Sequence, residues 1–253
     1  MSDLKLSGKR VIVTGAAGGL GRAFCEDLAA AGAHVIAADI DESGAAQTAK
    51  FISAADGKCI SGKLDVTKAE SCQMLVAQAI NEFGGLDVLV NNAALYGTLN
   101  RAPFEQLEED EWDRVLTVNV KGIWQMTRAA SEALKASGSG SVINIASATV
   151  YSGSPEWMHY VASKGAVIAM TRVMAKELGS ANVRANVIAP GITLTEASMT
   201  LMEDAKNYGA DRAALKRNGG VDDISGGVLY LASDLSKYTS GQTLVIDGGK
   251  QFI

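Results

Sequence analysis

Short apolar segments alternate with longer helical segments along almost the whole chain, and this alternation constrains the fold more than any other feature. Each apolar segment has the length of a buried strand, and helical periodicity follows it. Such a pattern predicts a parallel sheet with helices on both faces, a doubly wound α/β fold of Rossmann type. We expect strands at Arg10–Thr14, His34–Asp39, Cys59–Leu64, Asp87–Val90, Ser141–Ala146, Arg184–Ile188 and Thr243–Asp247.

The intervening segments predict helices, and nothing divides the chain into parts. There is no repeat, low-complexity run or linker, and 253 residues suit one large domain, so residues 1–253 are expected to form a single unit. The variable segment Ile192–Gly220 is expected to be a mobile lid over the substrate. We expect helices at Arg22–Ala31, Asp41–Ala54, Lys68–Phe83, Glu108 to about Lys135, Pro155–Leu178 and about Asp222–Ala232.

Composition excludes several classes of function. The net charge is −5 without a clustered run of Lys or Arg, which argues against nucleic acid and anionic membranes as partners. No apolar stretch approaches the roughly 18 residues of a membrane span, and Met1–Leu6 does not resemble a signal peptide. Cys25, Cys59 and Cys72 lack metal-ligand spacing and there are only two histidines, so we expect no metal, and reduced thiols in a cytoplasmic protein.

A glycine-rich turn joins the first strand to the first helix. The sequence T-G-A-A-G-G-L-G places Gly15, Gly19 and Gly21 between them. Glycines at these positions permit a tight turn and let backbone N–H groups approach a pyrophosphate at the helix N-terminus. Alone, a glycine-rich turn is weak evidence, but its strand–turn–helix context predicts a dinucleotide site.

The second strand ends in an acid, Asp39, which predicts the choice of cofactor. A carboxylate there can accept hydrogen bonds from both adenosine ribose hydroxyls. It would repel a 2′-phosphate, and Gly18, Ile40 and Asp41 offer no cation to offset that repulsion. We therefore expect NAD rather than NADP. The alternative is that Asp39 is a plain turn residue.

A proton-transfer site is predicted between Ser147 and Lys164. Ser154 and Pro155 suit an N-cap and a first helical position, so a helix is expected from Pro155. Tyr160 and Lys164 are four residues apart and would project from one helix face, about 5.4 Å apart along the axis. A positive charge at ~4 Å is worth ~4 kcal/mol, or about three pKa units, so Lys164 could bring the phenol into working range.

Ser147, expected at the carboxyl end of a strand, would hydrogen-bond the reacting oxygen. A Tyr and a Lys at helical spacing also occur by chance, as a half-buried ring beside a solvated stem. His159 would project about 100° away from Tyr160, which favours a packing or surface role.

Taken together, these segments resemble the short-chain dehydrogenase/reductase family over essentially the whole chain. The shared motifs are T-G-x-x-x-G-x-G at Thr14–Gly21, the pair Asp65-Val66, N-N-A at Asn91–Ala94 with Ala94 where glycine is usual, the helix asparagine Asn119, Ser147, Y-x-x-x-K at Tyr160–Lys164, P-G-x-x-x-T at Pro190–Thr195, and S-G-Q-T-L-x-x-D-G-G at Ser240–Gly249.

The resemblance implies an alcohol dehydrogenase or ketone reductase that transfers hydride to or from NAD. It implies that Tyr160 moves the hydroxyl proton, that Ser147 steadies the oxygen, that Lys164 lowers the phenol pKa and binds the nicotinamide ribose, and that Asn119 holds a relay water. The cofactor residues it implies are Gly15, Gly19, Leu20, Gly21, Asp39, Asp65, Val66 (the last two at adenine), Asn92, Tyr160, Lys164, Pro190, Gly191, Ile192 and Thr195.

The substrate is expected to be a neutral, largely apolar or aromatic alcohol or carbonyl compound. The resemblance places its pocket between the loops after Ala94 and Ala148 and the lid, and the segments 94–100, 148–159 and 192–202 contain no Lys or Arg. An anionic substrate would need such a cation, although Arg101, Lys206 or Arg212 could swing in. The candidate walls are Tyr96, Tyr151, Trp157, Met199 and Met202.

Three alternatives remain beside the small-molecule enzyme. They are a non-catalytic nucleotide-binding scaffold, a dehydratase or epimerase of the same superfamily, and a reductase of carrier-linked 3-oxoacyl substrates. The helix Tyr160–Leu178 is apolar around much of its circumference, so one stripe is left for a second partner. With the family resemblance, this predicts a homotetramer, or else a homodimer, paired through this helix and the preceding long one.

Overall fold

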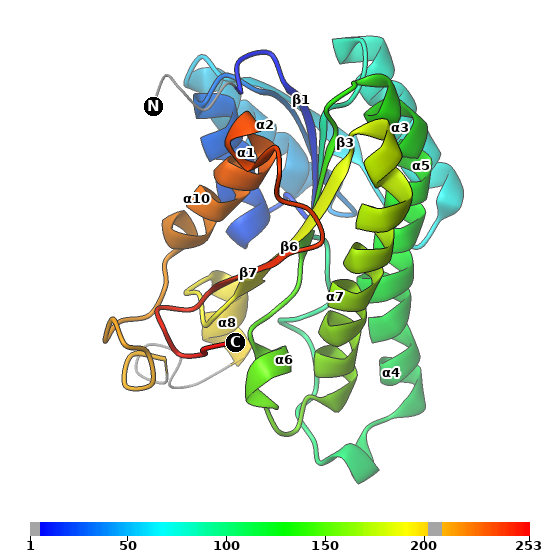
Figure 1. The fold of residues 1–253 in the computed structure, drawn as a ribbon. Helices are drawn as coiled ribbons and strands as arrows, with labels where there is room; N and C mark the ends of the chain where they lie inside the picture. Colours follow the sequence, from blue (N-terminus) through cyan, green and yellow to red (C-terminus); the bar gives the residue numbers. More distant parts are fainter. Residues whose placement is uncertain (1–5, 202–208) are drawn as a thin grey trace.

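The computed structural model describes residues 6–201 and 209–253. A parallel sheet lies at its centre (Figure 1). The sheet has seven strands in the order β3-β2-β1-β4-β5-β6-β7. This order reverses direction between β1 and β4, the point at which doubly wound folds bind ligands. The strands are β1 (Arg10–Thr14), β2 (His34–Asp39), β3 (Lys58–Lys63), β4 (Val88–Asn91), β5 (Ser141–Ile145), β6 (Arg184–Pro190) and β7 (Thr243–Ile246).

Helices cover both faces of the sheet, as Figure 1 shows. On one face lie α1 (Gly19–Ala30), α2 (Glu42–Ala54) and α10 (Val221–Ala232); on the other lie α3 (Ala69–Phe83), α5 (Gly122–Ala136) and α7 (Met158–Leu178). Alternate residues of β1 supply both cores. Val11 and Val13 pack under α1, and Ile12 packs under α3 and α5.

The shorter elements are α4 (Glu109–Leu116), α6 (Thr149–Ser152), α8 (Glu196–Leu201), the π-helix η2 (Thr117–Lys121), and the 3-10 helices η1 (Phe104–Gln106), η3 (Gly179–Ala181) and η4 (Asp234–Ser236). The single helix expected from Glu108 to Lys135 is therefore α4, η2 and α5 in succession. A π-helical turn carries one extra residue, which the hydrophobic pattern did not reveal.

The start of α7 differs from the sequence-based expectation. The helix begins at Met158 and not at Pro155, because Glu156 has φ 66°, a left-handed conformation that no α-helix continues. Trp157 occupies the N-cap position and its side chain makes no capping hydrogen bond. Ser154 therefore does not cap α7. Residues 149–152 instead form the separate helix α6, which ends at Gly153 with φ 58°.

The carboxyl ends of β1, β2, β4, β5 and β6 lie along one edge of the sheet, since all strands are parallel. Gly15, Asp39, Asn92, Ser147 and Gly191 follow or end these five strands. The fold thus gathers residues that are far apart in the sequence at a single edge.

Candidate active site

The turn after β1 is closely packed against the loop after β4. Gly15 has φ 68°, and a Cβ there would lie 2.8 Å from the Cα of Ala93; a Cβ on Gly21 would overlap the carbonyl of Gly15. The side-chain amide of Asn92 donates to the carbonyls of Thr14 and Gly15, at 3.0 Å in each case. Only glycine allows this approach of turn, helix and neighbouring loop.

The N-terminus of α1 is suited to bind an anion. Its N-cap, Gly18, offers no side-chain acceptor, and its first turn carries no acidic residue. The N–H groups of the first helical turn have no intrahelical partners, and the helix dipole favours negative charge there. A Cβ on Gly18 would meet nothing within 4 Å, so open space lies in front of the turn. These features fit the pyrophosphate of a dinucleotide.

Asp39 is held at the same edge by backbone hydrogen bonds. Its Oδ2 accepts from the N–H of Ala17 and its Oδ1 from the N–H of Asp41, both at 3.0 Å. Each carboxylate oxygen keeps a lone pair for a hydroxyl donor. The nearby cation Arg22 donates to the carbonyl of Ala17 at 2.6 Å and to Thr48 Oγ1 at 3.0 Å, so its guanidinium is bound within the turn.

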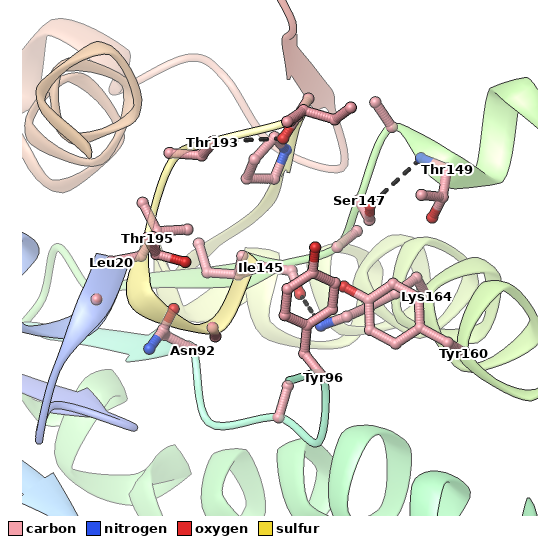
Figure 2. Close-up of a pocket in the computed structure, with 18 of the residues that line it drawn as sticks. Leu20, Asn92, Tyr96, Ile145, Ser147, Thr149, Tyr160, Lys164, Thr193 and Thr195 are labelled. Carbon is pink, nitrogen blue, oxygen red and sulfur yellow. Dashed lines mark hydrogen bonds between the residues drawn. The ribbon is translucent and has the colours of Figure 1, made fainter. Parts of the chain in front are cut away.

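Ser147, Tyr160 and Lys164 come together beyond the end of β5 (Figure 2). Tyr160 is 6% exposed and Lys164 is 3% exposed. The ammonium group of Lys164 donates to the carbonyl of Ile145 at 2.8 Å and lies 5.6 Å from the centroid of the Tyr160 ring. Ser147 Oγ accepts from the N–H of Thr149 at 3.3 Å, and its interaction with the Tyr160 phenol lowers the pKa of that group. The predicted cluster is therefore assembled.

In this structure the pKa of the Tyr160 phenol is shifted in the direction opposite to the one expected from Lys164. Burial raises the pKa of Tyr160, the neighbouring Tyr96 adds to that rise, and only the hydrogen bond with Ser147 lowers it. Burial also lowers the pKa of Lys164 to about 8. The sequence showed the spacing of the two residues but not how deeply both would be buried. Tyr160 thus holds its proton here, as a proton donor must.

Asn119 lies in the π-helix η2 and is fully buried. Its Oδ1 accepts from the N–H of Leu95 at 2.7 Å, and its Nδ2 donates to Ser163 Oγ at 3.1 Å. It therefore joins the loop after β4 to α7, one turn from Tyr160. Its expected role as the holder of a relay water stays a prediction.

One cavity of about 480 Å³ runs along the sheet edge from the glycine turn to Tyr160. It contains most of the residues predicted for the site. Those on its wall are Gly15, Gly19, Leu20, Gly21, Asp39, Asn92, Tyr96, Ser147, Trp157, Tyr160, Lys164, Pro190, Gly191, Ile192 and Thr195.

Several predicted site residues do not line this cavity. Asp65 Oδ1 accepts from Thr67 Oγ1 at 2.6 Å, and Val66 is buried with its carbonyl bound to Gln125 at 2.9 Å. Tyr151 packs in a separate apolar cluster, and Met199 is 45% exposed. Asn119 is fully buried and does not line the cavity. Met202 and Lys206 lie outside the described residues, as does part of the expected lid.

The substrate end of the cavity is more polar than expected. Arg101, Glu196 and Lys250 line it, although the segments chosen from the sequence contained no cation. Arg101 donates to Glu156 across 3.1 Å and lies 5.3 Å from the Trp157 ring centroid. Arg101 lies one residue beyond the segment 94–100, which was chosen from the sequence. Lys250 follows the glycine pair after β7. Its N–H donates to Asp247 Oδ1, and this turn directs the residue to the cavity wall.

An aromatic cluster forms the opposite side of this end. The rings of Tyr96, Trp157 and Tyr160 lie with their centroids 5.5 to 5.6 Å apart in tilted and edge-to-face arrangements. Leu99 and Val115 pack beneath them. Such rings offer flat contact area to a ligand.

The described residues also bear on metals and membranes. Among them, no group of three or more His, Cys, Asp or Glu side chains could hold a metal ion. Nor does any helix in those ranges have the length and apolar character to cross a membrane. Cys25, Cys59 and Cys72 are buried free thiols.

A family profile described as enoyl-(acyl carrier protein) reductase matches residues 15–251, which include both ends of the cavity. The chain therefore belongs to the short-chain dehydrogenase/reductase family, whose members are oxidoreductases that use nicotinamide cofactors.

Individual relatives match over nearly their full length. A 3-oxoacyl-[acyl-carrier-protein] reductase of Thermotoga maritima is 36% identical, with 97% of this chain and 99% of the relative covered. The 2-dehydro-3-deoxy-D-gluconate 5-dehydrogenase of Escherichia coli is 34% identical, with 98% of both covered. A crystal structure from Agrobacterium tumefaciens, provisionally assigned as a gluconate dehydrogenase, superposes with a TM-score of 0.92 at 31% identity, covering 99% of this chain and 98% of that one.

Proposed function

We propose that this protein is an NAD-dependent oxidoreductase that interconverts an alcohol and a ketone or aldehyde by hydride transfer. The observation that carries the proposal is the position of Ser147, Tyr160 and Lys164 at one end of a cavity whose other end is the glycine turn and Asp39. A cofactor and a substrate can thus meet in one enclosed space.

The residues that would hold NAD are the turn Gly15–Gly21, Asp39, Asn92 and the segment Pro190–Thr195, with Lys164 toward the nicotinamide ribose and Asp65 and Val66 toward the adenine. Bound there, the nicotinamide ring supplies or accepts a hydride. Tyr160 donates its proton to the carbonyl oxygen in reduction and recovers it from the hydroxyl in oxidation. Ser147 hydrogen-bonds that oxygen, and Asn119 holds the water through which Lys164 exchanges protons with solvent.

We infer a neutral substrate with a flat apolar part. The cluster of Tyr96, Trp157 and Tyr160 supports this choice, because a ring or chain packed against it is removed from water. Arg101 does not require an anionic substrate, since Glu156 already pairs with it at 3.1 Å. Hydroxy acids giving a higher kcat/KM than neutral aromatic or alicyclic alcohols would overturn the inference.

A second candidate is the reduction of a carrier-linked 3-oxoacyl substrate. The name of the Thermotoga maritima relative favours it, and the description of the family profile also names an acyl carrier protein. An acetoacetyl thioester tested beside acetoacetate ethyl ester separates the two candidates. A kcat/KM for the thioester more than about tenfold higher, which is more than 1.4 kcal/mol, would favour the carrier-linked substrate.

Replacing Tyr160 by Phe tests the assignment of the proton donor. Tyr160→Phe is expected to lower kcat at least about a hundredfold, in line with the loss of general acid catalysis, and to leave the Kd of NADH nearly unchanged. The matched control is Tyr151→Phe, since Tyr151 lies off the cavity. Turnover is measured from absorbance at 340 nm. A Tyr160→Phe enzyme that keeps more than a tenth of wild-type kcat would show that the assignment is wrong.

The same assay decides against the scaffold alternative if any substrate is turned over. A dehydratase or epimerase would change substrate without net change in absorbance. We also place the protein in the cytoplasm, and its three free buried thiols support that choice.

A further inference from the structure

His159 precedes Tyr160 and is fully buried, which rules out a surface role. Its Nε2 lies 3.5 Å from Oε2 of Glu111, a residue of α4 that is 7% exposed. Among the described residues, neither ring nitrogen of His159 has a hydrogen-bond partner. A buried carboxylate and a buried imidazole therefore face each other beside the candidate proton donor.

We propose that His159 and Glu111 form a hydrogen-bonded pair that positions Tyr160, with the His159 Nε2–H donating to Glu111. The inference rests on the proposed function, because it assigns Tyr160 the proton transfer. Neither side chain lines the cavity. Both are therefore positioning residues and not catalytic ones.

The first reason is the cost of the alternative. A buried carboxylate oxygen without a donor loses its hydration uncompensated, and removing one partner of a buried pair is strongly destabilising. The imidazole of His159 approaches Glu111 Oε2. The Nε2–H tautomer gives this oxygen a donor and leaves Nδ1, which has no hydrogen-bond partner among the described residues, as the unprotonated nitrogen.

The second reason is what Glu111 holds with its other oxygen. Its Oε1 accepts from the backbone N–H of Asn100 at 3.2 Å and from the Asn100 side chain at 3.4 Å. Asn100 precedes Arg101, and Ala102 donates to the carbonyl of Glu156 at 3.2 Å. Glu111 thus connects α7 to the loop that forms the substrate side of the cavity.

The third reason is the way in which α7 begins. Its N-cap makes no side-chain hydrogen bond, and it follows a left-handed residue, Glu156. Tyr160 lies in that first turn. A lateral hydrogen bond from the adjacent residue to α4 therefore limits rotation of the turn and of the phenol it carries.

Nuclear magnetic resonance of the histidine rings tests the pair without any need for turnover. The chain has two histidines, so His34→Gln assigns both sets of signals. We expect a proton on Nε2 of His159, and we expect Glu111→Gln to shift the His159 signals and not those of His34. A His159 ring with no proton on Nε2, or one insensitive to Glu111→Gln, would overturn the proposal. This measurement stays valid even if the proposed oxidoreductase activity is wrong.

Kinetics then separates positioning from packing. His159→Leu and Glu111→Leu are each expected to lower kcat about tenfold or more and to lower Tm, with the Kd of NADH within about twofold of wild type. The double variant removes both buried polar groups, so its Tm should recover toward wild type. Its kcat should stay low. Recovery of kcat together with Tm would mean that the pair only packs.

Two further variants complete the design. The amide of His159→Gln can still donate to Glu111 and should keep at least about a third of kcat, a change of under 1 kcal/mol. His34→Leu is the matched control, because His34 packs edge-on to Phe83 far from the cavity, and should leave kcat unchanged. A His159→Gln enzyme as slow as His159→Leu would contradict a role for the hydrogen bond.

Discussion

Lys164 carries an ammonium group that is almost entirely removed from water, and at this single residue stability and activity oppose each other. Burial lowers its pKa to about 8, whereas an unfolded lysine titrates near 10.4. Below about pH 8 both states are charged, and the folded state bears the full desolvation cost. As the pH rises from about 8 to 10.4 that cost disappears.

Lys164→Met should therefore stabilise the protein while removing its activity. We expect the free energy of unfolding at pH 7 to rise by about 1 to 3 kcal/mol, less the lost hydrogen bond to Ile145, and the gain to shrink toward pH 10. Urea denaturation at both pH values measures it. The control is Lys176→Met, an exposed lysine of the same helix, which should change stability little. A gain that grows with pH would contradict the argument.

At the same scale, sequence spacing predicted which side chains meet but not their environment. The four-residue interval brought Tyr160 and Lys164 to one site, as expected. The direction of the phenol pKa depends on burial by Tyr96 and neighbouring loops, and that burial arises from tertiary packing. Arg101 was expected only as a cation that could swing in, and it lines the cavity because the loop geometry sets which residue reaches it.

Among the structural elements, the turn into α1 and the end of β2 set the predicted cofactor preference. Gly18 is extended, with φ −168°, and faces open space, so an arginine fits there without strain. Asp39→Ser combined with Gly18→Arg should raise kcat/KM for NADP relative to NAD at least about tenfold, because a repelling carboxylate is replaced by a phosphate-binding guanidinium.

The wild-type protein is expected to favour NAD. Initial rates with both cofactors measure the ratio, and Asp41→Ser is the control, since Asp41 caps α2 and is absent from the cavity wall. Equal or better kcat/KM of the wild type with NADP would show that Asp39 does not select the cofactor.

The boundaries of helices and strands were predictable where the local sequence determines them. β1 and β2 have the predicted limits because polar or glycine residues follow each apolar run. The start of α7 was not, because Ser154 and Pro155 are favourable N-terminal residues by local preference. Glu156 pairs with Arg101, and its carbonyl accepts from the N–H of Ala102 in the neighbouring loop. These contacts outweigh the local preference, so the helix begins only at Met158.

For the whole molecule, the parallel sheet with helices on both faces followed from the alternation of strands and helices, whereas the association state is not fixed by one chain. A groove on the outer face of α4, η2, α5 and α7 is lined by Leu116, Val120, Trp124, Ala166 and Met170 among others. Trp124 is 45% exposed there, and Val173 is also exposed. A second apolar surface lies at the sheet edge, where Leu244, Phe252 and Ile253 are exposed.

Two separate apolar surfaces predict a homotetramer, because pairing each surface with its copy on another subunit generates one twofold axis. Trp124→Lys should remove one interface and leave dimers, whereas Met74→Lys, at an exposed residue of α3, should leave tetramers. Light scattering at micromolar concentration measures the mass. A wild-type protein that is monomeric under these conditions would contradict the prediction.

The π-helix η2 has a consequence for how this chain tolerates insertions and deletions. The five residues Thr117–Lys121 form a π-helical turn, which holds one residue more than a turn of α-helix. The side chains of α4 and α5 therefore do not have the relative directions that one continuous α-helix would give them. Deleting one residue here would restore a regular helix and keep its apolar composition. It would also rotate α4 by about 100° relative to α5, which would turn Asn119 and Glu111 away from α7. A single-codon deletion that looks harmless by helix propensity would thus disconnect α4 from the helix that carries Tyr160.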